Sequence, residues 1–401
     1  MRHPYNKKFS IAHWDNLDSD DFFINSLANS SEQYRKEIYD LYFGSTFVDD
    51  TIQYGNTMGT NATPGQYKNL LKIQDKYNVP ISLTLNEMNR PFQLLQPAIL
   101  KNLIKFIKKY YDDGVRSCTI SHVHLMRTGA LQSKFPDMQW KNTVNHGIKS
   151  TQEFINYVKL GYNVVQLDRD FNRNFSELKR VSKEADRLKI KTCLLIKEGC
   201  MPECPFKVEH DCWQSSKDLK DTGKNYWQTV DFTCGHWNKV SSDYEKDVGV
   251  TNPRTGTDIM IHAKDDWDEF AGLTDIFKMA GRLHNTKSDD LEESFCRSFE
   301  TRQDKTKLPY TTLFRVDSFK QVYDHNLAPF HMWLTSSAVK KNYPRLTDIK
   351  EIKKHTASHF WNTEKAITLS KILKNCKNQC YKCHKCDELF GTKELDSILE
   401  L

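Results

Sequence analysis

Residues 150–196 read STQEFINYVKLGYNVVQLDRDFNRNFSELKRVSKEADRLKIKTCLLI. Two amphipathic stretches in it, 150–161 and 174–189, repeat apolar residues at three-and-four spacing, as a helix with one buried face does. Each stretch is followed by a short apolar run, at 163–167 and 190–196, which predicts a buried strand. The segment therefore predicts helix, strand, helix and strand in succession, the pattern of parallel strands joined by right-handed crossovers.

Residues at the expected helix ends support this assignment. Ser150 precedes the first helix, and Gly161 follows its last turn. Asn174, with Glu177 three residues further on, resembles a capping box at the start of the second helix.

The same alternation extends in both directions along the chain. Further amphipathic stretches occur at 63–78 and 94–114, and further strand candidates at 37–43, 79–85, 115–123, 141–145 and 275–280. Seven or eight repeated strand–helix units favour a closed α/β fold, a TIM-type (β/α) barrel. An open, doubly wound sheet is the alternative, because periodicity does not report whether a sheet closes.

The alternation is interrupted at 197–273, where Cys, Trp, Gly and charged residues follow neither period. A loop of this length is uncommon unless it is functional, and in a barrel it would lie over the C-terminal mouth. We expect residues 1–36 to be an N-terminal extension and 37–283 to be the barrel with this long Cys-bearing loop. Residues 284–401 are expected to form a helical C-terminal appendage that ends in a Cys cluster.

The composition indicates a soluble protein with a core. Of 401 residues, 38% are hydrophobic, 27% charged and 12% aromatic. No run reaches the roughly 18 apolar residues of a membrane span, and the N-terminus has no secretory apolar region, so we expect a cytoplasmic location. The net charge of +6 permits an anionic substrate such as RNA, but the absence of a nucleic-acid-binding motif predicts no stable DNA binding.

Eight of the eleven cysteines form two groups. The loop group is Cys200, Cys204, Cys212 and Cys234, and the tail group is Cys376, Cys380, Cys383 and Cys386. Because thiols stay reduced in the cytosol, clustered cysteines indicate metal ligation there. The tail spacing, C-x3-C-x2-C-x2-C, suits an iron–sulfur cluster; structural zinc, or no metal, is the alternative. Cys118 and Cys193 fall within strands and are expected to be small buried hydrophobes.

Polar residues at the expected strand ends are the catalytic candidates. They are His122 and His124, which would share one strand face and could meet one ligand, together with Asp168, Glu198 and Arg282. Glu198 could position substrate or move protons beside the loop cysteines, and Arg282 could bind an anionic group. Each has a structural alternative, since such residues also cap helices or form ion pairs, and the histidines could simply be satisfied by backbone carbonyls.

Several common catalytic motifs are absent from the sequence. It contains no G-x-x-x-x-G-K-[ST], no G-x-G-x-x-G, no H-E-x-x-H and no G-x-S-x-G. Nucleotide hydrolysis, nicotinamide chemistry and serine hydrolysis are correspondingly disfavoured.

Four segments of the sequence occur in the same order as the characteristic segments of one known family. Asn145–His146 follows a strand, then come STQEFINYVKLGYNVVQLDRDFNRNFSELKRV, a strand leading into KEGCMPECPFKVEHDCW, and finally DIFKMAGR. Over residues 79–283 the chain resembles the peptidase U32 family of collagenase-like peptidases. The resemblance does not extend to the C-terminal appendage.

The resemblance implies a (β/α) barrel and a 4Fe-4S cluster, because several members of that family look like iron–sulfur proteins that hydroxylate aromatic precursors or RNA bases without O2. Cys200, Cys204 and Cys234 best match their ligands, and the fourth would be Cys212 or a cysteine of the tail. Where the better-known members of the family have Gly-Arg-Cys at the entry to the loop, this chain has Lys197–Glu198–Gly199–Cys200. The tail could hold a second cluster or zinc.

We therefore expect an iron–sulfur-dependent, oxygen-independent, hydroxylase-like enzyme that acts on a small aromatic or RNA substrate with an electron-transfer partner. A U32-type peptidase, which would be a hydrolase, is one alternative. A zinc-stabilised binding protein without catalytic activity is the other.

Overall fold

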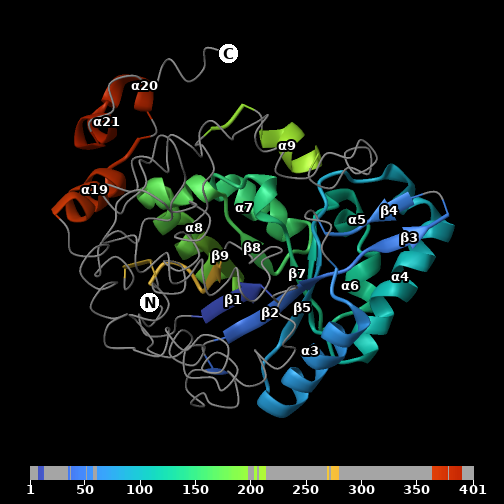
Figure 1. Ribbon diagram of the computed structural model, residues 1–401. Coiled ribbons are helices and arrows are strands. Elements are labelled where there is room, and N and C mark those ends of the chain that lie inside the picture. Colours follow the sequence, from blue (N-terminus) through green and yellow to red (C-terminus); the bar gives the residue numbers. More distant parts are fainter. Residues whose placement is uncertain are drawn as a thin grey trace, which may run out of the picture.

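Eight parallel strands close into a barrel in the computed structural model, which describes residues 8–12, 35–36, 38–50, 52–56, 61–196, 203–205, 207–213, 269–270, 272–279, 364–377 and 379–390. Neighbouring strands of the barrel are also neighbours along the chain, and the last strand pairs with the first. The strands are β1 (Lys8–Ala12), β2 (Ile38–Gly44), β5 (Ile81–Leu85), β6 (Ser117–Ile120), β7 (Gln139–Lys141), β8 (Val164–Gln166), β9 (Lys191–Ile196) and β10 (Ile276–Met279). Figure 1 shows helices around this barrel, so the expected TIM-type fold is confirmed.

The barrel begins earlier in the chain than the sequence indicated. β1 lies within residues 1–36, the stretch assigned to an N-terminal extension, and pairs with both β2 and β10. The boundary at residue 37 is therefore wrong. The strand expected at 141–145 is also displaced, since β7 ends at Lys141 and a 3-10 turn, η2 (Val144–His146), follows it.

Among the described residues, four helices around the barrel match the amphipathic stretches of the sequence. They are α3 (Pro64–Tyr77), α4 (Pro97–Asp112), α7 (Thr151–Lys159) and α8 (Phe175–Leu188). Shorter elements add a hairpin, β3 (Phe47–Asp49) and β4 (Ile52–Tyr54), the helices α5 (Val123–Arg127) and α6 (Ala130–Lys134), and the 3-10 turns η1 (Phe92–Leu95) and η3 (Arg169–Arg173). Among the described helices none combines the length and apolarity needed to cross a membrane.

Helix caps explain where these helices start. The Ser150 side chain accepts a hydrogen bond from the Glu153 amide and begins α7. Asn174 accepts one from the Glu177 amide and begins α8, but the Glu177 carboxylate binds Thr151 instead of returning to the cap. The capping box is therefore only half formed at α8, and it is complete at α3, between Thr63 and Gln66.

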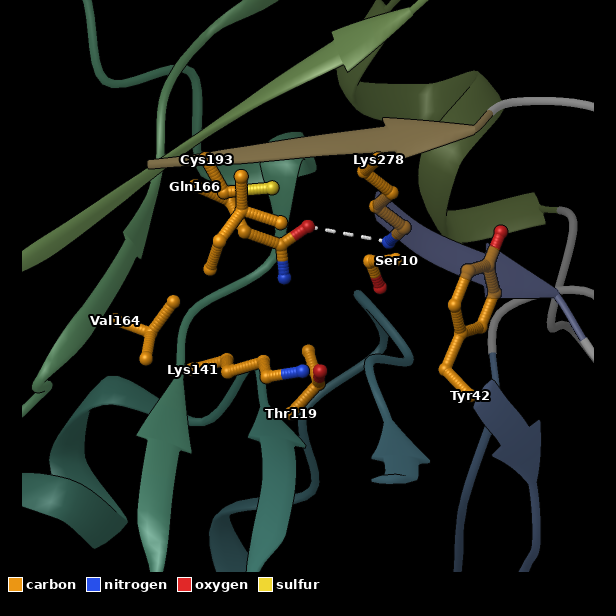
Figure 2. A pocket seen from close by; sticks show the side chains of 9 residues that line it. Ser10, Tyr42, Thr119, Lys141, Val164, Gln166, Cys193 and Lys278 are labelled. Carbon is orange, nitrogen blue, oxygen red and sulfur yellow. Dashed lines mark hydrogen bonds between the residues drawn. The ribbon is translucent and has the colours of Figure 1, made fainter. Parts of the chain in front are cut away.

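The inside of the barrel is polar. Alternate strand residues point inward, among them Ser10, Thr119, Lys141, Gln166 and Lys278, which line a cavity with room for about one water molecule (Figure 2). The residues between them join the helices in the hydrophobic core, among them Leu41, Leu83, Trp140, Val165 and Phe277.

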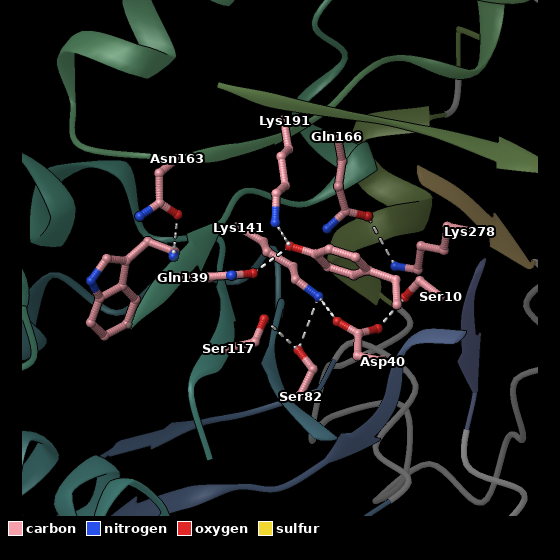
Figure 3. Close-up of polar contacts among 12 residues, drawn as sticks. Ser10, Asp40, Ser82, Ser117, Gln139, Lys141, Asn163, Gln166, Lys191 and Lys278 are labelled. Atoms are coloured by element: carbon pink, nitrogen blue, oxygen red, sulfur yellow. Dashed lines mark hydrogen bonds and ion pairs between the residues drawn. The ribbon is translucent and has the colours of Figure 1, made fainter. Parts of the chain in front are cut away.

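A buried ion pair crosses this interior (Figure 3). The Lys141 ammonium contacts the Asp40 carboxylate, and their side chains are only 6% and 1% exposed. Asp40 also accepts a hydrogen bond from Ser10 at 2.5 Å, and Lys141 donates one to Ser82 at 3.2 Å. The pair therefore ties together residues of β1, β2, β5 and β7.

A β-bulge in β2 brings a second side chain inward. The register passes from Phe9 opposite Ile38 to Ser10 opposite Asp40, which leaves Tyr39 without a partner on β1. The Tyr39 hydroxyl donates to Gln139, and the Lys141 ammonium lies 5.2 Å from its ring centre. Such a bulge redirects side chains, and here it lets the adjacent residues Tyr39 and Asp40 both contact Lys141.

The described part of the C-terminal region is helical. It consists of α19 (Glu364–Lys374), α20 (Cys380–Cys383) and α21 (Lys385–Phe390), which Figure 1 shows on the side of the barrel that carries α8. Leu369 and Leu373 of α19 are buried, and Lys374 forms an ion pair with Glu269 at 2.7 Å. This region therefore packs on the barrel.

Candidate active site at the carboxyl ends of the strands

Five polar side chains follow successive strands at one end of the barrel. Glu87 follows β5, Ser121 and His122 follow β6, His146 follows β7 and Asp168 follows β8. In (β/α) barrels this end, the C-terminal mouth, carries the chemistry. The mouth is therefore the candidate active site.

Tyr54 organises one side of the mouth. Its hydroxyl is fully buried, donates to the Leu85 carbonyl at 2.8 Å, and accepts from the amides of Ser121 and His122 at 3.1 and 3.2 Å. Burial raises the pKa of Tyr54 well above its usual range. Glu87 is fixed beside it by the Gly55 amide at 2.8 Å, so this side of the mouth is rigid.

His122 is engaged by backbone groups on both ring nitrogens. Its Nδ1 accepts a hydrogen bond from the Leu125 amide at 3.1 Å, so its Nε2 carries the proton and donates to the Pro91 carbonyl at 3.2 Å. Burial lowers the pKa of His122. The expectation that His122 and His124 share a strand face is wrong, because His122 caps α5 and His124 lies within that helix, with the two ring centres 6.4 Å apart. His122 matches the structural alternative.

His146 offers a hydrogen-bond acceptor at the mouth. Its Nε2 donates to the Ser121 carbonyl at 2.7 Å, while its Nδ1 is buried without a hydrogen-bond partner. Its ring packs against Tyr157, with centres 5.0 Å apart. Burial, opposed by the Ser121 hydrogen bond, lowers the pKa of His146 to about 4, so the ring is neutral near pH 7. In the sequence His146 is one of several polar residues that follow a strand, and only the structure shows the unpaired Nδ1 that distinguishes it.

Asp168 and Asp170 form a buried acidic pair after β8. They are 3% and 6% exposed, and Asp168 accepts a hydrogen bond from the Asp170 amide at 2.9 Å. Burial and the charge of Asp170 raise the pKa of Asp168, against the Asp170 amide, Arg169 and Lys149, which lower it. Asp170 lies 3.7 Å from the Lys149 ammonium, and its Oδ1 has no hydrogen-bond partner. A carboxyl group with a raised pKa can hold and release a proton.

The described part of the Cys-bearing loop reaches both sides of the mouth. Glu203 forms an ion pair with Lys149 at 2.8 Å, and α9 (Lys207–Trp213) continues from there. At its other end Cys212 lies close enough to the charges of Arg90 and Glu87 for both to act on its thiol. Burial raises the pKa of Cys212, Arg90 lowers it, and Asp211, Glu209 and Glu87 raise it further.

Two candidate cysteine ligands therefore lie at the mouth. The side chains of Cys204 and Cys212 are partly exposed. Cys200 and Cys234, with Glu198 and Arg282, lie outside the described residues, so the loop cluster and the roles of these two charged residues stay predictions.

Cys118 and Cys193 are confirmed as buried thiols within strands. Burial raises the pKa of both, that of Cys193 to about 12. Neither is suited to metal ligation or nucleophilic attack, both of which require a thiolate.

The tail cysteines lie on the short helices at the end of the chain. Cys376 and Cys386 are partly exposed and Cys383 is exposed, and the side chain of Cys380 is outside the described set. Among the side chains that the structure describes, no three from His, Cys, Asp and Glu are grouped to hold a metal ion. A metal at the tail, iron–sulfur or zinc, also stays a prediction.

No protein-family model matches the chain, and neither does any curated protein. Among solved structures it is similar to the U32 peptidase Mk0906, with a TM-score of 0.43, 9% identity, and coverage of 69% of this chain and 93% of that one. It is also similar to the YdjI aldolase from Escherichia coli K12, with a TM-score of 0.37, 10% identity, and coverage of 83% and 94%. At these scores neither likeness bears on function, and the fold rests on the strand pairing described above.

Proposed function

We propose that this protein is an enzyme whose active site is the C-terminal mouth of the barrel, and that it is an iron–sulfur-dependent, oxygen-independent enzyme acting on an aromatic or nucleobase substrate. The observation that carries the proposal is the position of residues 203–205 and 207–213, which brings Cys204 and Cys212 to the same mouth as Asp168 and His146. In the U32 resemblance Cys204 matches a cluster ligand, and Cys212 is one of the two candidates for the fourth, the other being a cysteine of the tail.

The two cysteines suit a cluster in chemistry and position. Both side chains are partly exposed, whereas those of Cys118 and Cys193 are buried in the core. A 4Fe-4S cluster, when bound, supplies one-electron chemistry. Cys204 and Cys212, with Cys200 and Cys234, would hold it.

The other mouth residues have separate parts in the proposed reaction. Asp168, whose pKa is raised by burial, exchanges a proton with the substrate. His146 accepts a hydrogen bond from a substrate N–H or O–H at Nδ1, because its tautomer is fixed by the Ser121 carbonyl. Replacing C–H by C–OH with water as oxygen source releases two electrons and two protons, so the reaction also requires an electron-accepting partner.

Anaerobic purification with iron and sulfide analysis tests the proposal. The wild-type chain should contain both elements, and Cys204→Ser should lose most of them. If Cys212 is the fourth ligand, Cys212→Ser should also lose most of the iron and sulfide. Cys193→Ser is the matched control, because this thiol faces the barrel interior and should not affect iron content.

A wild-type protein with neither iron nor sulfide would contradict the proposal. Peptide cleavage that survives both Cys200→Ser and Cys204→Ser would favour the U32-type hydrolase instead. Stoichiometric zinc without iron, together with a Glu198→Gln variant that alters only stability, would favour the non-catalytic binding protein.

A further inference from the structure

Lys149 connects the Cys-bearing loop to the barrel. It lies between η2 and α7, and its ammonium is 2.8 Å from the Glu203 carboxylate and 3.7 Å from that of Asp170. Burial lowers the pKa of Lys149, but the hydrogen bond that Lys149 donates to Glu203 and the charges of Asp168 and Asp170 raise it overall. Lys149 is therefore a cation shared between the loop and the acidic pair after β8.

Glu203 immediately precedes Cys204, so the position of its carboxylate constrains the cysteine. Its backbone has a φ of 51°, in the left-handed region that residues other than glycine rarely adopt. Local backbone preference therefore does not favour this conformation, and a contact outside the segment must stabilise it. The ion pair with Lys149 is such a contact.

We propose that Lys149 is a positioning residue that holds Cys204 over the mouth through its ion pair with Glu203. Its role goes beyond the proposed function in one respect, because it concerns the protein before any cluster is bound. Any effect of Lys149 on catalysis rests on the proposed function. The Lys149 ammonium that orients the cysteine segment also faces Asp170, and so sets the distance between the Cys204 thiol and the acidic pair.

Alkylation of Cys204 in the reduced, metal-free, full-length chain measures this directly. The rate of modification by iodoacetamide is followed by peptide mass spectrometry, with the exposed Cys383 of the same chain as internal reference. Lys149→Met should raise the rate at Cys204 about two- to fivefold at low salt, the range expected for a partly exposed ion pair. Added salt should raise the wild-type rate towards that of the variant, whose own rate should not change.

The charge-reversed pair separates positioning from a general loss of stability. Lys149→Glu and Glu203→Lys should each raise the rate at Cys204, and the double variant should bring it back towards the wild-type value. Lys108→Met is the matched control, because Lys108 forms a similar pair with Asp112 at 2.6 Å on α4, within a single helix. If Lys149→Met does not fold, Glu203→Gln tests the same contact from an exposed position.

An unchanged alkylation rate in Lys149→Met or Glu203→Gln, or a double variant as reactive as the single ones, would overturn the inference. Because no metal is present in the assay, its result is independent of the proposed function. A wild-type protein without iron but with a salt-dependent, Lys149-dependent rate would refute the cluster and leave the positioning role intact.

Discussion

At the scale of single residues, the two histidines at the mouth of the barrel differ in whether both of their ring nitrogens have hydrogen-bond partners. His122 has backbone partners at both ring nitrogens, whereas His146 keeps a free acceptor at Nδ1. Both follow strands in the sequence, so position alone treats them alike. The difference comes from their local structure, because His122 caps the start of helix α5, whereas His146 ends the 3-10 turn η2.

His146 should make stability depend on pH. Its pKa is about 4 in the folded protein and about 6.5 when unfolded, so its contribution is complete above pH 6.5 and is lost as pH falls towards 4. The difference in unfolding free energy between wild type and His146→Gln should therefore shrink over this range, by at most about 1.4 kcal/mol per pH unit. Urea denaturation at several pH values measures it, and a constant difference would contradict the assignment.

Asp168→Asn should lower activity without lowering stability at pH 7. Because burial raises the pKa of Asp168, its charged form is disfavoured in the folded protein, and the resulting cost grows as pH rises. The variant should therefore be at least as stable as wild type at pH 7, with the gap closing at acidic pH. Turnover should fall, since Asn cannot exchange a proton. Thermal unfolding beside an activity assay would refute this if the variant were both less stable and fully active.

At the scale of elements, the helices could be predicted and two of the strands could not. A helix such as α8 buries one face, so its apolar residues repeat within a single segment. The strands β1 and β7 carry Ser10, Gln139 and Lys141, whose partners are polar groups. Rules that look for apolar runs therefore missed β1 and displaced β7. The candidate site was found only as a set of strand ends, because partners such as Lys149 and Glu203 come from distant parts of the chain.

The contribution of the α3 capping box to the free energy of unfolding should be measurable. Thr63→Ala removes the side-chain hydrogen bond to the Gln66 amide and should cost about 1 kcal/mol of unfolding free energy. Thr63→Ser keeps the hydroxyl and is the control. Equal midpoints of urea unfolding for Ala and wild type would show that this cap does not contribute.

At the scale of the whole molecule, the ion pair between Asp40 and Lys141 links strands across the barrel. Lys141→Met alone should cost roughly 3–5 kcal/mol, because it leaves the Asp40 carboxylate buried without its cation. The double variant Asp40→Leu with Lys141→Met should lose much less than the sum of the single variants. Lys108→Met, in an exposed pair, should stay within about 0.5 kcal/mol of wild type. Additive losses would argue against coupling across the interior.

Barrel closure gives a second test at this scale. A chain that starts at residue 37 lacks β1 and leaves both β2 and β10 with an unpaired edge. We expect it to lose cooperative thermal unfolding, as followed by circular dichroism. A sharp transition at the wild-type temperature would mean that the barrel does not need β1.

The pairing of β1 with β10 also has a consequence for biosynthesis. Lys8 pairs with Ile276, so the ribosome must produce nearly the whole barrel sequence before its first strand finds one of its two neighbours. At about 5–20 residues per second, the nascent strand waits roughly 10–60 s with an edge open to other chains. Yield in a cell should therefore respond to translation speed and to chaperones that shield a growing chain.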